Sequence, residues 1–134
     1  MTAAEYFRAD KDSFWTPYIE VNKGGMWDRL KPEIFREGLY HDCSDADNML
    51  GKLLLGKEPL RPALAKLNLS DERYGRVRRA YIRLSEDRAV SPSLQDRLLN
   101  LTKVDRVETL KASHSAYFSM LEKLVDTLVK LSSC

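Results

Sequence analysis

Two residues with the chemistry of a general acid–base pair stand in corresponding places in the second half of the chain. Asp87 follows a predicted strand by about three residues, and His114 follows the next predicted strand by about two. A carboxylate that accepts a hydrogen bond from an imidazole N–H fixes the tautomer of the ring and stabilises the imidazolium, as a general base requires. An aspartate and a histidine are two members of a catalytic triad. The nucleophile expected before them in the sequence is missing.

The two side chains meet only if the strands before them are parallel neighbours. Val77 to Leu84 alternate polar and apolar residues at the two-residue period of a strand, and Arg106 to Ala112 predict a second strand. Ser91-Pro92 predicts a helix start between them. Strand, helix and strand at these lengths predict a right-handed crossover, with both strand ends at one edge and the strands about 4.8 Å apart. Open α/β sheets bind ligands at this edge.

Two amphipathic helices complete this half of the chain. The helix after Ser91 has an apolar stripe made of Leu94, Leu98 and Leu101. The C-terminal helix has one made of Phe118, Leu121, Val125, Leu128 and Leu131. We therefore expect a βαβα unit with two parallel strands over residues 71–134.

Residues 1–70 have a different character and predict a mostly helical segment. The expected elements are helices over Ala3 to Phe14, from Pro32 to about Tyr40 and after Ser44, a short extended piece at Tyr18 to Val21, and a helical turn at Ala63 to Leu67. A boundary between the two segments falls near residue 70. The chain is thus expected to be of the α/β class.

The composition is typical of one soluble domain, with 134 residues, 43% apolar and 31% charged. A net charge of +2 is too small to indicate a nucleic-acid partner. No apolar run approaches the length of a membrane-spanning helix, and the first residues do not resemble a secretory signal. Cys43 and Cys134 are far apart and one is terminal, which favours free thiols. We expect a cytoplasmic protein without nucleic-acid or membrane partners and without a cofactor.

Two stretches of the second half resemble the α/β-hydrolase superfamily. Arg79-Ala-Tyr-Ile-Arg-Leu-Ser-Glu-Asp-Arg-Ala-Val-Ser91 is similar to its late acid-bearing strand and loop, and Val104-Asp-Arg-Val-Glu-Thr-Leu-Lys-Ala-Ser-His-Ser-Ala-Tyr-Phe-Ser119 is similar to its final strand and histidine loop. The nearest branch holds the plant methylesterases and hydroxynitrile lyases with their bacterial relatives. Gln95 to Leu101 lie where this branch has its intervening helix. Tyr40-His-Asp-Cys-Ser44 resembles a recurring cap segment of the bacterial relatives.

The resemblance implies a partial α/β-hydrolase fold, with residues 1–70 as a cap, or lid, and residues 71–134 as the C-terminal part of the core. It also implies that Asp87 is the triad acid and His114 the triad base. The family's serine stands in Gly-x-Ser-x-Gly, upstream of the cap, and none of the six glycines begins this motif. The serine and the oxyanion-hole amides are therefore expected from elsewhere. The implied substrate is a small apolar ester, thioester or lactone.

Other residues offer alternative chemistry. Cys43 lies two residues from His41, and a cysteine–histidine pair can be nucleophilic, although a half-buried structural cysteine is the simpler interpretation. His41, Asp42, Asp45 and Asp47 are metal-binding residue types, but they lack a recognisable ligand spacing. We therefore expect no metal site and a solvated helix start.

Arginines and aromatic residues form two further groups. Six arginines fall between residues 73 and 88, namely Arg73, Arg76, Arg78, Arg79, Arg83 and Arg88. An anionic ligand would explain them, but their alternation with apolar residues favours a solvated face of the sheet. The aromatic residues of the first half are candidates either for core packing or for a substrate pocket; they include Tyr6, Phe7, Trp15 and Trp27. Ser115 and Ser119 are expected to form hydrogen bonds or helix caps.

A two-stranded parallel sheet leaves an unpaired edge that usually recruits another chain. We expect a homodimer or a complex with a companion N-terminal hydrolase half. Three functions remain open. The first is an esterase-like site completed by another chain. The second is a repurposed hydrolase that binds a ligand or acts as a non-covalent cyclase or isomerase. The third is a non-catalytic interaction subunit.

Overall fold

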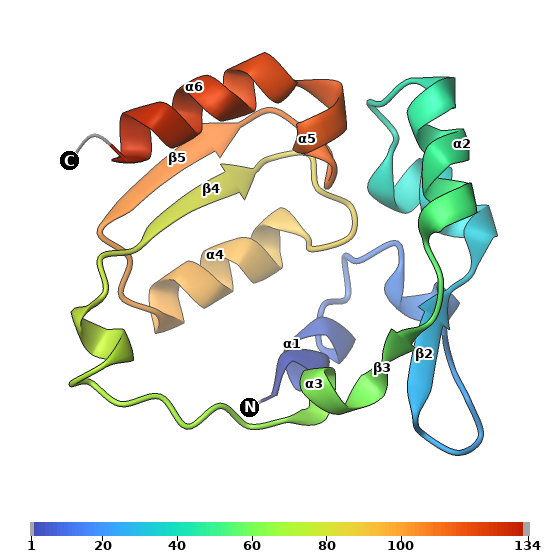
Figure 1. Cartoon of the computed structure of the whole chain (residues 1–134), viewed down its shortest axis with the longest axis horizontal. Coiled ribbons are helices and arrows are strands. Elements are labelled where there is room, and N and C mark those ends of the chain that lie inside the picture. Colours follow the sequence, from blue (N-terminus) through green and yellow to red (C-terminus); the bar gives the residue numbers. More distant parts are fainter. Residues whose placement is uncertain (1, 133–134) are drawn as a thin grey trace.

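The computed structural model describes residues 2–132, and in them the second half of the chain forms a parallel βαβα unit (Figure 1). Strands β4 (Ala80–Leu84) and β5 (Arg106–Leu110) pair in parallel, with Ala80 opposite Arg106 and Leu84 opposite Leu110. The crossover contains helix α4 (Pro92–Leu101), which Ser91 caps through its side chain. The expected α/β class, the crossover and the parallel pair are confirmed.

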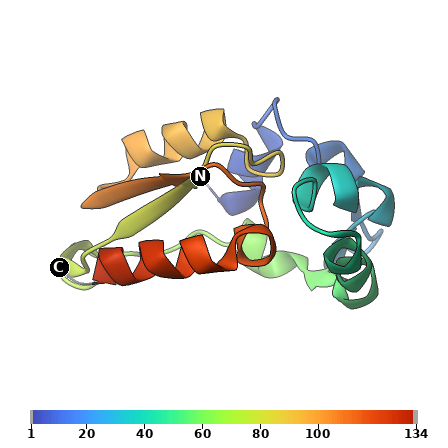
Figure 2. The same ribbon diagram turned by 90° about the horizontal axis from the view of Figure 1, so that it is seen from above.

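Helices cover both faces of this small sheet. Helix α4 lies on one face, and α5 (Ala116–Ser119) leads into α6 (Leu121–Ser132) on the other (Figure 2). An apolar cluster of this unit consists of the buried Leu110, Ala112 and Ala116, with Ile82, Leu84, Met120 and Leu124 packed around them. Arg83 forms a bidentate ion pair with Asp96 of α4 at 2.6 and 2.8 Å, which ties this strand to this helix.

Residues 2–70, the segment expected to be a cap and called the cap below, contain a sheet that the sequence did not predict. Strands β1 (Ile19–Val21), β2 (Trp27–Leu30) and β3 (Glu58–Pro59) form a three-stranded antiparallel sheet in the order β1-β2-β3. The expected extended piece corresponds to β1, but β2 and β3 were missed. β3 is only two residues long and pairs with Trp27 and Asp28 of β2. Such a short strand has no readable periodicity of its own.

The helices of the cap differ from the expected ones in length and type. Helix α1 (Ala3–Arg8) begins with a capping box between Thr2 and Glu5 and ends well before Phe14. The expected Pro32–Tyr40 helix is a 3₁₀ turn (Pro32–Ile34) followed by a π-helical turn (Phe35–Leu39). Helix α2 (Asp45–Leu54) starts at the expected Ser44 cap. Helix α3 (Leu60–Leu64) begins three residues earlier than the expected turn.

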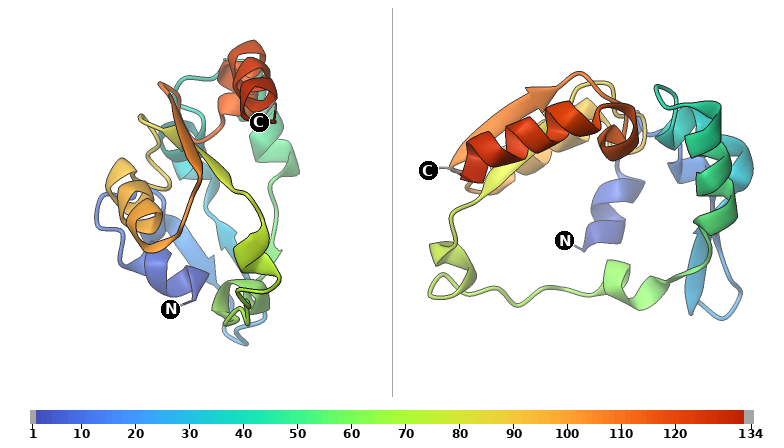
Figure 3. Two further views of the ribbon diagram at one scale, coloured as in Figure 1. Left: turned by 90° about the vertical axis from the view of Figure 1, so that its left-hand side faces the viewer. Right: turned by 45° about the horizontal axis from the view of Figure 1, so that its top comes forward.

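A second buried cluster lies in the cap, apart from the cluster under β5. It consists of Ile34, Phe35, Leu39, Tyr40, Cys43 and Ala89, with Trp15 and Leu30 packed against it. Ala89 comes from the loop after β4, so this cluster also joins the cap to the βαβα unit. The connection between α3 and β4 runs along the outside of the molecule (Figure 3), through 3₁₀ turns and coil that leave Leu67 and Leu69 largely exposed.

No helix within residues 2–132 is long and apolar enough to cross a membrane. The expected free thiol of Cys43 is present and buried. The expectation for Cys134 lies outside the described residues.

The Gly51→Ala variant tests the packing of α2 on the cap. A β-carbon at Gly51 would lie 2.6 Å from Cε2 of Tyr40, whose ring is buried and cannot retreat. Overpacking of this kind costs about 1–3 kcal/mol, and the helix propensity gained from alanine offsets about 1 kcal/mol of it. We expect the midpoint of urea unfolding to fall. The matched control is Gly56→Ala, where nothing lies within 4 Å of the new carbon. Equal midpoints for the two variants would contradict the packing described.

Candidate active site

The structure brings Asp87 and His114 into direct contact at the carboxyl ends of β4 and β5. Asp87 lies in the acid loop (residues 85–91) and His114 in the histidine loop (residues 111–115). The Asp87 Oδ2 and His114 Nδ1 atoms are 2.9 Å apart. The Asp87 side chain is 4% exposed and that of His114 is 30% exposed. The carboxylate is therefore buried, while the imidazole reaches the surface.

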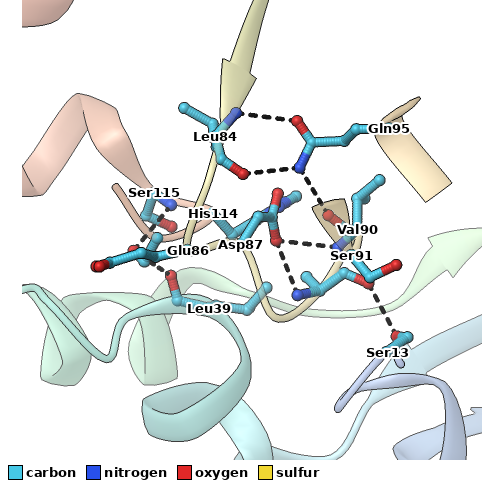
Figure 4. A network of polar contacts seen from close by, with 12 residues as sticks. Ser13, Leu39, Leu84, Glu86, Asp87, Val90, Ser91, Gln95, His114 and Ser115 are labelled. Atoms are coloured by element: carbon cyan, nitrogen blue, oxygen red, sulfur yellow. Dashed lines mark hydrogen bonds and ion pairs between the residues drawn. The ribbon is translucent and has the colours of Figure 1, made fainter. Parts of the chain in front are cut away.

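The backbone of the acid loop fixes the direction of the Asp87 carboxylate. Its Oδ1 atom accepts the N–H groups of Ala89 at 2.8 Å and Val90 at 2.9 Å (Figure 4). The other oxygen is thereby left for the imidazole. Because a carboxylate only accepts, Nδ1 of His114 carries the proton in this contact. The Nε2 atom of the neutral ring then has the lone pair, which is the arrangement of a histidine that removes a proton from a nucleophile.

A short segment at the start of the cap holds the acid loop from outside. The buried Asp10 carboxylate accepts the N–H of Ser91 at 2.9 Å and its hydroxyl at 2.6 Å. Ser13 donates its hydroxyl to the carbonyl of Ala89 at 2.8 Å, and the N–H of Phe14 donates to the carbonyl of Arg88 at 2.7 Å. These contacts join positions about eighty residues apart, so no local sequence signal indicated them.

Gln95 closes the inner side of the acid loop. Its side-chain amide accepts the N–H of Leu84 and donates to the Leu84 carbonyl, both at 2.9 Å, and it also donates to the carbonyl of Val90 (Figure 4). Gln95 is 1% exposed. It takes the place of a neighbouring strand at the end of β4, and sequence reasoning placed it only within a helix.

Aromatic side chains of the cap approach the imidazole. The Trp15 and His114 rings have centroids 5.5 Å apart, and Phe7 meets Trp15 edge to face at 6.0 Å. Phe7 also borders an apolar hollow of about 240 Å³ between α1, β1, β2 and α3. A more open hollow of about 490 Å³ borders the acid loop at Glu86, Asp87 and Arg88. Trp15 therefore packs against the buried cluster of the cap and also contacts His114 in the candidate site.

The alternative nucleophile, Cys43, does not pair with His41. The Nε2 atom of His41 lies 2.9 Å from the carbonyl oxygen of Glu86, and the Cys43 thiol points to Asp42 and to the carbonyl of Ser115. Burial raises the pKa of Cys43 to about 11, and the hydrogen bond to Asp42 and its negative charge act in the same direction. A nucleophilic cysteine needs a lowered pKa. The structure therefore indicates a structural thiol.

The candidate metal residues have other partners. Asp45 pairs with Arg36 at 2.8 Å, and Asp47 completes the capping box of α2 with Ser44. Within residues 2–132 no three His, Cys, Asp or Glu side chains are grouped to hold a metal ion.

The arginine group is also dispersed rather than focused on one ligand site. Arg83 pairs with Asp96, Arg88 with Glu37, and Arg79 lies over the ring of Tyr74.

Comparisons with known proteins show which family and fold the chain is similar to. No protein-family model matches the chain. A chloroplastic methylesterase-like protein of Arabidopsis thaliana (methylesterase 11) is 33% identical over 104 residues, which are 77% of this chain and 27% of that protein. Polyneuridine aldehyde esterase of Rauvolfia serpentina is 31% identical over 124 residues, 90% of this chain and 47% of the esterase. The crystal structure of a methylesterase from Arabidopsis superposes with a TM-score of 0.79 at 27% identity, covering 86% of this chain and 52% of that one.

The chain thus spans between about a quarter and about half the length of these relatives. The expected resemblance and the partial α/β-hydrolase fold are confirmed. The catalytic roles of Asp87 and His114 stay predictions, because the comparisons do not address individual residues.

The alkylation rate of Cys43 tests whether its thiol is structural or nucleophilic. In a Cys134→Ser background, we expect iodoacetamide at pH 8 to alkylate Cys43 on the order of 100-fold more slowly than a free thiol of pKa about 8.5, because far less thiolate is present. The rate in 6 M guanidinium chloride is the control and should match that of a model peptide. Fast alkylation of the folded chain would restore Cys43 as a candidate nucleophile.

Proposed function

From the premise that the chain carries the cap and C-terminal portion of an α/β-hydrolase related to the methylesterases, we propose that it supplies the acid and base of an acyl-transfer site. Asp87 is the acid and His114 the base. A serine nucleophile comes from a companion polypeptide or from an upstream part of the same precursor. The 2.9 Å contact between Asp87 Oδ2 and His114 Nδ1 at the shared edge of two parallel strands carries the proposal.

In the proposed reaction, Nε2 of His114 takes the proton of the serine hydroxyl as the oxygen attacks the substrate carbonyl. Asp87 holds the ring in the required tautomer and stabilises the imidazolium that forms. His114 then returns the proton to the leaving alcohol or thiol, and a water molecule repeats the steps to release the acid. The proposed substrate class is the small apolar ester, thioester or lactone that the resemblance to the methylesterases implies. Apolar surface near the pair is supplied by Trp15, which lies beside His114, and by Phe7, which borders an apolar hollow.

The oxyanion hole belongs to the same companion. Its backbone amides normally adjoin the nucleophile turn, and losing one donor costs on the order of 10² to 10³ in rate. The 134 residues contain no Gly-x-Ser-x-Gly. We therefore expect this chain to bind and orient but not to hydrolyse an ester by itself.

The exposed surface of the chain supports a companion. The accessible surface is 9239 Å², whereas a compact monomer of 15.4 kDa has roughly 7,200 Å². The apolar side chains that remain about half exposed include Leu121, Val125 and Leu128 of α6. An excess of roughly 2,000 Å² on one partner is of the size that obligate interfaces bury.

The free edge of β4 is the natural place for a strand of the companion. The N–H of Ser85 donates to the carbonyl of Leu110 in β5. Because backbone groups alternate in direction along a strand, those of Arg83 and Tyr81 also face β5. The N–H and C=O groups of Leu84, Ile82 and Ala80 therefore face away from β5. The side-chain amide of Gln95 already forms hydrogen bonds with the N–H and the carbonyl of Leu84. Ala80 and Ile82 therefore present the outward donors and acceptors of this edge. A second copy of the chain would be the alternative occupant.

Reconstitution tests the proposed activity. The chain is mixed with a separately expressed hydrolase half that carries the early strands and Gly-x-Ser-x-Gly, and hydrolysis of p-nitrophenyl butyrate is followed. We expect no activity from either part alone and activity from the mixture. His114→Ala should lower kcat by a factor on the order of 10⁶, because the serine then lacks its base.

The control for that experiment is Asp126→Ala, which removes an exposed carboxylate of α6 and should leave the rate unchanged. Activity in the mixture that survives His114→Ala would refute the proposal. Saturable conversion of a ligand by the isolated chain would instead favour a cyclase or isomerase.

Association through the β4 edge is tested by size-exclusion chromatography with light scattering. We expect the isolated chain to self-associate and the mixture to elute as a complex. Ala80→Pro removes an outward N–H from an exposed position at the first residue of the strand and should weaken both associations. Ala80→Ser keeps this N–H and is the matched control. A chain that stays monomeric and also forms no complex with the companion would contradict association through the β4 edge.

A further inference from the structure

One turn of the cap forms hydrogen bonds with both the acid loop and the histidine loop. This cap turn consists of residues 39–43, from the last residue of the π-helical turn to the residue before the Ser44 cap of α2. The contacts of its consecutive residues His41 and Asp42 reach different loops. Each contact falls on the residue that immediately precedes one member of the Asp87–His114 pair.

Asp42 holds the histidine loop. Its Oδ2 atom accepts the backbone N–H of Ser113 at 2.8 Å, and the hydroxyl of Ser113 donates to the carbonyl of Leu39 at 3.3 Å. Ser113 is fully buried, so loss of Asp42 removes the acceptor of its N–H and its protection from exchange. Burial pushes the pKa of Asp42 upward, but hydrogen bonds from Ser113, Ser119 and Cys43 together outweigh this effect and keep the pKa below its usual value. Asp42 is therefore a charged acceptor at neutral pH.

His41 holds the acid loop. Its Nε2 atom lies 2.9 Å from the carbonyl oxygen of Glu86, and because a carbonyl only accepts, Nε2 donates the proton. The N–H of Glu86 donates to the carbonyl of Ala112 at 3.1 Å. The two loops and the cap turn thus form a closed ring of hydrogen bonds around the Asp87–His114 contact.

We infer that Asp42 is a positioning residue for His114, and that the cap turn sets the distance between the acid and the base. The inference rests on the proposed function, since positioning matters to a reaction only if the pair takes part in one. The small sheet gives the histidine loop no second strand neighbour, because β5 pairs with β4 alone among the described strands. Contacts from the cap therefore take over the restraint that a neighbouring strand would give.

From its sequence position, Asp42 was expected to be part of a solvated helix start. Asp42 precedes the Ser44 cap of α2 and takes no part in the capping box, which Ser44 and Asp47 form without it. Its partner Ser113 is 71 residues away. The role is visible only once the histidine loop is seen beside the cap.

Nuclear magnetic resonance of the isolated, full-length chain tests the inference without ester hydrolysis. Two signals are read: the exchange rate of the Ser113 amide and the ¹⁵N shifts of the His114 ring, which show which nitrogen holds the proton. In Asp42→Ala we expect at least a tenfold faster exchange of the Ser113 amide and a shift of the ring from the Nδ1–H form towards the tautomer mixture of free imidazole. Asp126→Ala is the matched control and should change neither signal.

Asp42→Asn keeps an amide oxygen at the same place and should restore most of the Nδ1–H form, even if Asp42→Ala fails to fold. An unchanged ring signal in Asp42→Ala, or a ring signal equally lost in Asp42→Asn and Asp42→Ala with the fold intact, would overturn the inference.

Reconstituted enzyme supplies a second readout. Asp42→Ala should lower kcat about tenfold or more with little change in KM, because the proposed role of Asp42 is to orient the base and not to contact the substrate. Reconstitution that fails while the ring signal responds to Asp42→Ala would sink the proposed function and leave the positioning of His114 intact. Full activity of Asp42→Ala would sink only the positioning role.

Discussion

Because β4 and β5 run in the same direction, the loops that follow them leave the sheet at one edge, and the meeting of Asp87 with His114 follows from that pairing. The ladder continues past the strand ends, where Ser85 and Glu86 donate to the carbonyls of Leu110 and Ala112. The two loops therefore start in register. An antiparallel pair would send them to opposite ends of the sheet. Strand direction thus decides whether an acid–base pair exists, and the loops decide only its geometry.

The loops owe that geometry to polar contacts more than to apolar packing. The apolar core is split into a small cluster under β5 and another in the cap. The acid loop instead forms hydrogen bonds with Gln95 of α4 and with Asp10 and Ser13 of the cap. Buried polar groups are costly unless they are paired, so each of these contacts restricts the loop to one arrangement. A chain with a limited core can hold a precise site in this way.

Local patterns in the sequence were enough for the elements that carry the candidate site. The alternation in β4, the Ser91-Pro92 helix start and the stripes of α4 and α6 each span only a few residues. The cap was less predictable because distant partners decide its structure. Helix α1 stops at Arg8, and Asp10 turns to Ser91, 81 residues away. β3 exists only through its pairing with β2. Gln95 and Asp42 act on backbone groups of other segments, so their residue types gave no sign of their roles.

Acid and base are the parts of a triad that one half of a hydrolase can prepare alone. The Asp87 carboxylate and the His114 ring contact each other, the backbone of the acid loop and Trp15 of the cap, and this chain supplies all of these groups. A nucleophilic serine has different requirements, a sharp strand-to-helix turn and amides aimed at the developing oxyanion, and these need the early strands. The two sets of requirements do not overlap. Under the proposed function, the acid–base pair is therefore preorganised on one folding unit and meets its nucleophile when a strand of the companion adds to the outer edge of β4.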